Sequence, residues 1–138
     1  MSTYLDASVI LRIALTQPGR LEDLASLGRC IVSALAEVEC LRTLDRLRLA
    51  RHLPDAELAS RRALVFRLLA SMEVVELDPA ILRRAAQPLP TSLATLDAIH
   101  LATATLWQEE NGTPIVMATH DAALATAARA NGMKVIGA

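Results

Sequence analysis

Carboxylates dominate the residues of this sequence that could do chemistry. Five of them lie just beyond the ends of short apolar runs, or in the helices expected between those runs: Asp6, Glu37, Glu39, Asp97 and Asp121. Like charges at close range raise one another's pKa, so a cluster of these acids needs a cation to stay ionised. Oxygen ligands suit a hard divalent ion such as Mg²⁺ or Mn²⁺. Such ions activate water and stabilise phosphoryl transition states, so the pattern predicts metal-dependent hydrolysis of the kind that nucleases perform.

Three of the acids also have a structural explanation as helix caps. Asp6 could cap a helix that begins near Ser8, for which Ser8 is itself a candidate N-cap. Asp121 could cap the last helix, and Asp97 could interact with the dipole at the start of its own helix. Asp97 has apolar neighbours, however, and a carboxylate in that setting is hard to explain as ordinary surface. The spacing leaves both explanations open for Asp6 and Asp121.

Two glutamates lie on one expected helix, and they compete for a place in the cluster. Glu37 and Glu39 are two positions apart and therefore point to different faces. Glu39 could instead be solvated and pair with Arg42 at i,i+3. We expect Glu37 to be the solvated one, but periodicity alone does not decide which of the two turns inward.

Other chemistries have less support in the sequence. His52, His100 and His120 are too scattered for a zinc site. His100 stands one turn after Asp97, and we expect its ring to be buried with satisfied nitrogens, while His120 is a weaker candidate for a substrate contact. No dinucleotide-binding glycine motif, P-loop or nucleophile-elbow motif is present, so nucleotide-loop and serine-hydrolase functions lack support.

Short apolar runs bounded by turn residues indicate the strands that must position these acids. The expected strands are Thr3–Leu5, Cys30–Val32, Val74–Leu77, Pro114–Ala118 and Lys134–Ile136. The expected helices are Ser8–Leu15, Ser33 or Ala34 to Leu53, Ala56–Met72, Pro79–Ala86, Thr95–Glu110 and Asp121–Ala130. This alternation predicts an α/β fold in three layers, with a short, mostly parallel sheet between helices. Functional groups in such folds gather beyond the carboxyl ends of the strands.

Composition limits the remaining possibilities. A chain of 138 residues that is 53% hydrophobic is expected to form one domain, residues 1–138, with a substantial core. A net charge of −1 argues against a generic polyanion-coating protein, and 2% aromatic residues argue against base-stacking modules. Cys30 and Cys40 lack metal-binding spacing and are expected to be buried thiols. The start of the chain does not read as a signal peptide, so we expect a soluble cytoplasmic protein.

Four segments resemble, in order, the motifs of PIN-domain proteins: Tyr4–Leu11, Ser33–Arg42, Leu96–Ala104 and Ala118–Asp121. The last is followed by the helix, glycine and strand that close that family's fold. In the second motif the family's Glu falls six residues after the strand-end Ser33, which selects Glu39 over Glu37. In its length and in the residues of these motifs, the chain is similar to VapC toxins of bacterial toxin–antitoxin pairs.

The resemblance implies an endoribonuclease that depends on Mg²⁺ or Mn²⁺, in an α/β/α sandwich. It implies that the acidic pocket consists of Asp6, Glu39, Asp97 and Asp121. Asp6, Asp97 and Asp121 would bind the metal, Glu39 would orient or deprotonate the attacking water, and the hydroxyls of Ser8 and Thr119 would support the site. Homodimerisation and inhibition by a VapB-like antitoxin are also implied.

Substrate RNA would need cationic contacts despite the net charge of −1. Arg42 and Arg46 lie on the same expected helix as Glu39 and could bind phosphates beside the acidic pocket. Alternatively, these two arginines do not bind phosphate and belong to a solvated helix face, where nearby acids such as Asp45 balance their charge. Two other functions stay open: an α/β signalling module such as a phospho-acceptor receiver, and an inactive PIN-like protein that only binds RNA or a partner.

Overall fold

A parallel sheet of five strands forms the centre of the computed structural model, which describes all 138 residues. The strands are β1 (Ser2–Leu5), β2 (Arg29–Ser33), β3 (Glu73–Val75), β4 (Ile115–Ala118) and β5 (Lys134–Ile136). Their order across the sheet is β3-β2-β1-β4-β5, and every neighbouring pair is parallel. The five predicted strands are all present. The third is shifted from the predicted Val74–Leu77, because its register pairs Val75 with Ser33, the last residue of β2.

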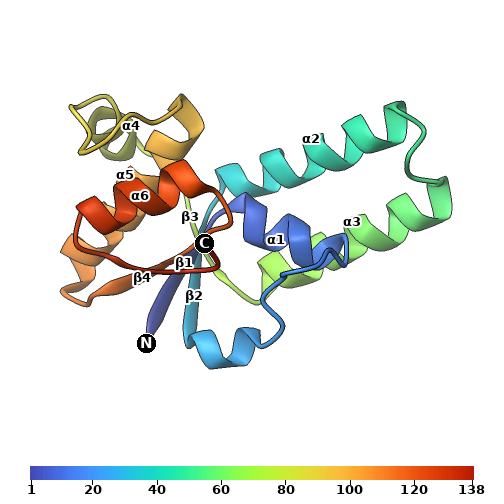
Figure 1. Cartoon of the computed structure of the whole chain (residues 1–138), viewed down its shortest axis with the longest axis horizontal. Helices are drawn as coiled ribbons and strands as arrows, with labels where there is room; N and C mark the ends of the chain where they lie inside the picture. Colours follow the sequence, from blue (N-terminus) through green and yellow to red (C-terminus); the bar gives the residue numbers. More distant parts are fainter.

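The helices connect and cover these strands (Figure 1). They are α1 (Ala7–Ala14), α2 (Leu35–Leu49), α3 (Asp55–Ala70), α4 (Pro79–Ala85), α5 (Thr95–Asn111) and α6 (Ala122–Ala130), with a short 3₁₀ helix η1 (Leu24–Leu27) that the sequence did not predict. The second helix ends four residues before the predicted Leu53. Ala50 closes it, and Arg51 takes a left-handed backbone conformation with φ of 58°, which no α-helix continues.

Alternating side chains of the strands divide the core into two layers of helices. Tyr4, Ile31 and Met117 belong to a cluster with residues of α5 and α6. Their neighbours along the strands point to the opposite face, where Val32 packs with α1, α2 and α3, and Leu5 with α1 and η1. The fold is therefore the predicted three-layer α/β/α sandwich. Figure 1 shows α2 and α3 projecting from the sheet as a long antiparallel pair.

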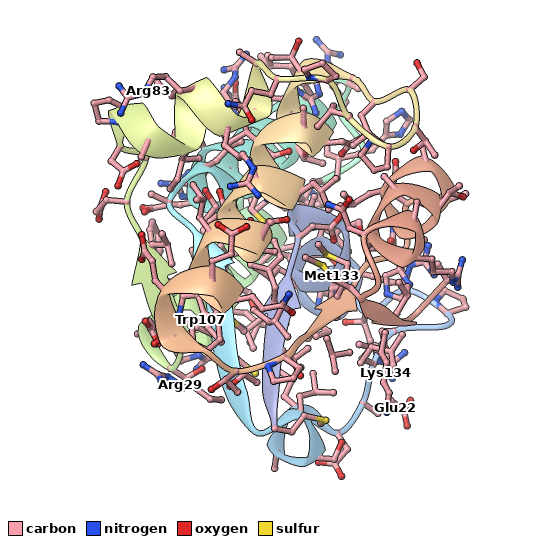
Figure 2. The ribbon with its side chains drawn as sticks, turned by 90° about the vertical axis from the view of Figure 1, so that its left-hand side faces the viewer. Glu22, Arg29, Arg83, Trp107, Met133 and Lys134 are labelled. Atoms are coloured by element: carbon pink, nitrogen blue, oxygen red, sulfur yellow. The ribbon has the colours of Figure 1, made fainter.

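The amino ends of the strands are closed by a polar contact on α5 (Figure 2). The indole N–H of Trp107 donates to Glu73 at 3.2 Å, and the Arg29 guanidinium lies 5.4 Å from the centre of the Trp107 ring. Glu73 also pairs with Arg29. These contacts join the amino ends of β2 and β3 to α5.

The two thiols differ from each other more than the sequence predicted. Cys40 is buried in the core, and burial raises its pKa to about 12. Cys30 is only half-buried, because it is the second residue of β2, near the amino end of the strand, so the expectation of burial was wrong for this residue. Neither cysteine forms a disulfide. None of the helices has the length and apolar character needed to cross a membrane.

Candidate active site

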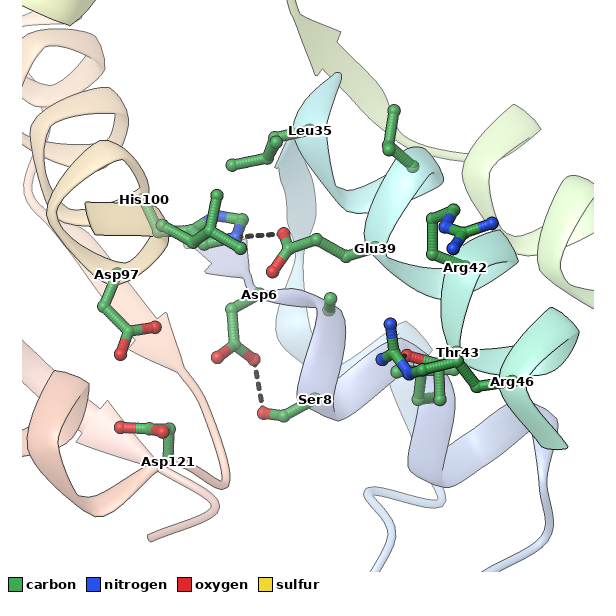
Figure 3. A pocket seen from close by; sticks show the side chains of 14 residues that line it. Asp6, Ser8, Leu35, Glu39, Arg42, Thr43, Arg46, Asp97, His100 and Asp121 are labelled. Carbon is green, nitrogen blue, oxygen red and sulfur yellow. Dashed lines mark hydrogen bonds and ion pairs between the residues drawn. The ribbon is translucent and has the colours of Figure 1, made fainter. Parts of the chain in front are cut away.

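The carboxyl edge of the sheet opens into a pocket of about 420 Å³. The residues that the sequence singled out and that line it are Asp6, Ser8, Glu39, Arg42, Arg46, Asp97 and Asp121. In Figure 3, Asp6 lies between two walls, with Asp97 and Asp121 on one side and Glu39 on the other. Glu37 is exposed and does not line the pocket. Four separate segments therefore bring four carboxylates to one place, and the helix turns Glu39 rather than Glu37 toward them.

Asp6 is held rigidly at the point where β1 becomes α1. It is the N-cap of α1, so the expectation that Ser8 caps this helix was wrong. Its Oδ1 accepts from the backbone N–H of Val9 at 3.3 Å and from the Ser8 hydroxyl at 2.5 Å. Its Oδ2 accepts from the Thr119 hydroxyl at 2.7 Å. Asp6 is only 4% exposed, so these hydrogen bonds replace most of the solvation that its carboxylate would have in water.

Thr119 connects two of the four acids. Its hydroxyl donates to Asp6 and accepts from the backbone N–H of Asp121 at 3.0 Å. Asp121 is the N-cap of α6, where its Oδ1 accepts from the N–H of Leu124 at 2.8 Å. Ser8 makes a parallel connection, because its oxygen accepts from the N–H of His120 at 2.9 Å. Ser8 and Thr119 thus connect the start of α1 to the segment that follows β4.

Replacement of Thr119 by Val is expected to lower the free energy of unfolding by about 1–3 kcal/mol, because it leaves buried hydrogen-bonding groups without a partner. Thr119 is fully buried, and its hydroxyl serves both Asp6 and Asp121. Urea denaturation measures the difference, with Thr113→Val as the control at an exposed position. Equal stabilities for Thr119→Val and Thr113→Val would show that the connection contributes nothing.

Asp97 lies in the first turn of α5, lines the pocket, and its side chain makes no hydrogen bond to the protein. Its pKa is raised, first by burial and then by the neighbouring charge of Asp121, with smaller effects of the same sign from Asp6 and Glu39. The neighbouring His100 lowers the pKa of Asp97. The ionised form of Asp97 is therefore disfavoured in the folded protein as it stands, and a bound cation would relieve that effect.

Glu39 reaches the pocket from α2 and is hydrogen-bonded to a buried histidine. Its Oε1 lies 2.6 Å from Nε2 of His100, and Nδ1 of the same ring lies 2.6 Å from the hydroxyl of Tyr4. The expectation that His100 is buried with both nitrogens satisfied is confirmed. Its contact with Glu39 was not predicted. The available signal was the i,i+3 spacing of Asp97 and His100, which puts both side chains on one face of α5.

The donor set agrees with the chemistry of a hard divalent ion, although no three acidic, His or Cys side chains stand close enough to form a complete metal site by themselves. The four acids that line the pocket supply carboxylate oxygens. The second oxygen of Asp121 and of Glu39, and both oxygens of Asp97, have no hydrogen-bond partner in the protein. No Lys or Arg forms an ion pair with any of the four acids. Oxygen ligands and uncompensated negative charge fit Mg²⁺ or Mn²⁺.

Arg42 and Arg46 form the outer wall of the pocket on α2. Arg42 pairs with Asp45 at 3.3 Å. For Arg42, this agrees with the alternative that these arginines lie on a solvated helix face balanced by nearby acids. Arg46 donates to the Thr43 hydroxyl at 3.0 Å and pairs with no carboxylate. Both side chains are exposed beside the acids, so a polyanion that enters the pocket would meet them.

Comparisons with known proteins identify the family and agree with the fold. The model of the PIN domain family matches residues 3–130. Ribonuclease VapC46 of Mycobacterium tuberculosis (strain ATCC 25618 / H37Rv) is 36% identical over 137 residues, which cover 96% of this chain and 95% of that protein. The crystal structure of PAE2754 from Pyrobaculum aerophilum superposes with a TM-score of 0.61 at 22% identity, covering 97% of this chain and 89% of that one. The chain belongs to the PIN-domain family, and within it resembles the VapC ribonucleases.

Proposed function

We propose that this protein is an endoribonuclease toxin of the VapC type that uses Mg²⁺ or Mn²⁺, with residues 1–138 acting as one catalytic domain. The observation that carries the proposal is the convergence of Asp6, Glu39, Asp97 and Asp121 in one pocket. A chain that belongs to the PIN-domain family and is 36% identical to a named ribonuclease supports the choice of RNA as substrate.

Three of the acids would hold the ion, and the fourth would act on water. Asp6, Asp97 and Asp121 are the proposed ligands, with Asp121 binding directly or through water. When bound, the ion supplies charge stabilisation for the phosphoryl group and lowers the pKa of water. Glu39 would orient the attacking water and accept its proton on the oxygen that His100 leaves free. Ser8 and Thr119 would keep the Asp6 carboxylate in place through the hydrogen bonds described above.

RNA would approach across α2, where Arg42 and Arg46 would bind its phosphates. The double variant Arg42→Ala/Arg46→Ala is expected to weaken RNA binding. It should also lower the magnitude of the slope of the log binding constant against log salt concentration by about one to two, because each phosphate contact releases roughly one counterion. Fluorescence anisotropy with labelled RNA over a salt series measures both. The control is Arg83→Ala, an exposed arginine on α4 that lies outside the acidic pocket (Figure 2). An unchanged slope in the double variant would contradict this assignment.

We also propose a homodimer and an inhibitory partner of the VapB type, acting in the cytoplasm. Support for the partner comes from the rim of the pocket, where Val38 is 57% and Leu96 46% exposed. Apolar side chains of this size beside a charged pocket are typical of a surface that another protein covers. Light scattering of the purified chain tests the dimer.

Expression of the chain without its partner in a bacterial host tests the proposed function. We expect growth arrest, and sequencing of RNA 5′ ends shortly after induction should show new ends at a small number of sites. Glu39→Gln, expressed at the same level, should give neither effect. Wild-type protein that arrests growth without producing new ends, or that is silent in both assays, would favour an inactive RNA- or partner-binding PIN protein instead. Labelling by a phosphodonor would favour a receiver.

A further inference from the structure

The ring of His100 connects the core to the pocket. It is 1% exposed, and both of its nitrogens are engaged: Nδ1 with the Tyr4 hydroxyl and Nε2 with Glu39, each at 2.6 Å. Tyr4 is itself fully buried in the middle of the sheet, and its ring meets the imidazole edge-on, with centroids 5.8 Å apart. A chain of two short hydrogen bonds therefore runs from β1 through α5 to the carboxylate on α2.

For a neutral imidazole, the chemistry of the two ends gives both hydrogen bonds one direction. An ionised carboxylate can only accept, so Nε2 of His100 carries a proton and donates it to Glu39. The phenol of Tyr4 is fully buried with its oxygen 2.6 Å from Nδ1, and a phenol carries a proton that it can donate there. In this arrangement Tyr4 and Glu39 favour the same imidazole tautomer, the one that presents an N–H to Glu39.

Glu39 depends on this contact for its orientation. It comes from α2, on the wall opposite Asp97, and His100 is its only hydrogen-bond partner in the protein. A glutamate with three rotatable side-chain bonds loses conformational freedom when it is fixed, so something must hold it. The buried ring holds Oε1 and leaves Oε2 without a protein partner in the pocket. Figure 3 shows the Glu39 carboxylate directed toward Asp6.

We propose that His100 is a positioning residue, whose Nε2–H holds Glu39 for its action on the attacking water, and that Tyr4 fixes the tautomer that makes this possible. This inference rests on the proposed ribonuclease activity. Packing alone does not explain the arrangement, because an apolar side chain at position 100 would fill the same core without the cost of burying two polar nitrogens.

A double-mutant cycle between His100 and Glu39 separates positioning from general structural damage. His100→Phe keeps an aromatic ring but removes both hydrogen bonds. We expect it to lower kcat for RNA cleavage about 10- to 100-fold, which is the range found when a supporting hydrogen bond is lost. KM should change little. In a Glu39→Gln background the same change should have less than about a twofold effect, since there is no carboxylate left to position. His100→Gln, whose amide can still donate, should recover part of the rate.

Additive effects of His100→Phe and Glu39→Gln, or a wild-type rate for His100→Phe, would overturn the proposal. His52→Ala, at an exposed histidine outside the pocket, is the control and should cleave at the wild-type rate. If wild-type protein does not cleave RNA, the proposed function itself fails, which is a different result from a cycle that is additive in an active enzyme.

Nitrogen NMR of labelled histidine gives a readout that does not depend on activity or on folding of the His100 variant. Wild-type His100 is expected to carry its proton on Nε2, and Tyr4→Phe should shift the ring toward a mixture of tautomers and lower kcat several-fold. A neutral wild-type ring protonated on Nδ1 would overturn the proposal, as would a tautomer that Tyr4→Phe leaves unchanged.

Discussion

Replacement of Asp6 by Asn is expected to lower the rate of RNA cleavage by at least about 10³-fold, the scale seen when a group central to an active site is removed. Asp6 lies between the two walls of the pocket and is the proposed ligand that the fold holds most firmly. Asn has the same shape but no charge, so the attraction for a divalent cation is lost. Growth arrest on expression should disappear with the activity.

The fold of Asp6→Asn should persist, because Asn is as good an N-cap as Asp. Its Oδ1 can still accept from the N–H of Val9 at the start of α1. Circular dichroism and thermal unfolding check this point. Asp78→Asn provides the matched control, since Asp78 caps α4 in the same way, through the N–H of Ile81, but lies outside the pocket. The account would be contradicted by a folded Asp6→Asn protein that cleaves RNA at the wild-type rate.

Replacement of Asp97 by Asn should have opposite effects on activity and stability. We expect a loss of cleavage of about 10²- to 10³-fold, because a charged group that faces the reacting centre is removed. At pH 7 the variant should also be more stable than the wild type. The folded protein raises the pKa of Asp97, through burial first and through Asp121 second, so ionised Asp97 destabilises the fold. Asn keeps the shape and removes that charge.

The pH dependence gives the sign of this effect a direct test. A carboxyl whose pKa is raised by folding destabilises the protein above that pKa, and the penalty is lost as the pH falls through it. The stability difference between Asp97→Asn and wild type should therefore be present at pH 7 and shrink to nothing near pH 4, the ordinary value for Asp. Because Asp97 is partly solvated, we expect a gain below about 1 kcal/mol, or about 1–3 °C in Tm. A lower Tm for the variant in metal-free buffer at pH 7 would be the contrary result.

The strands could be predicted because buried parallel strands leave a strong local signal. Runs such as Ile115–Ala118 and Lys134–Ile136 are short, apolar and preceded by turn residues. Helix ends carried less information. The end of α2 depends on the left-handed backbone at Arg51, and η1 depends on the Asp23 cap, neither of which interrupts the apolar pattern.

Two of the acids could be located from sequence because their positions follow from topology. Asp6 follows β1 directly and Asp121 follows β4 after two residues, and parallel strands all end at one edge of the sheet. The resemblance to PIN proteins selected Glu39, and the structure places its side chain at the pocket. The Tyr4–His100 contact could not be predicted in the same way, because it joins residues 96 positions apart through side chains of two different layers.

The most direct test of the central claim is the initial rate of RNA cleavage as a function of free Mn²⁺ or Mg²⁺, after the purified protein has been stripped with chelator. Wild-type protein is predicted to cleave nothing in excess EDTA and to regain full activity, with saturation, as either ion is restored. Asp97→Asn should stay far below the wild-type rate at every metal concentration. Cleavage that persists in EDTA, or a variant that matches the wild type at saturating metal, would contradict a metal-dependent nuclease built on these four carboxylates.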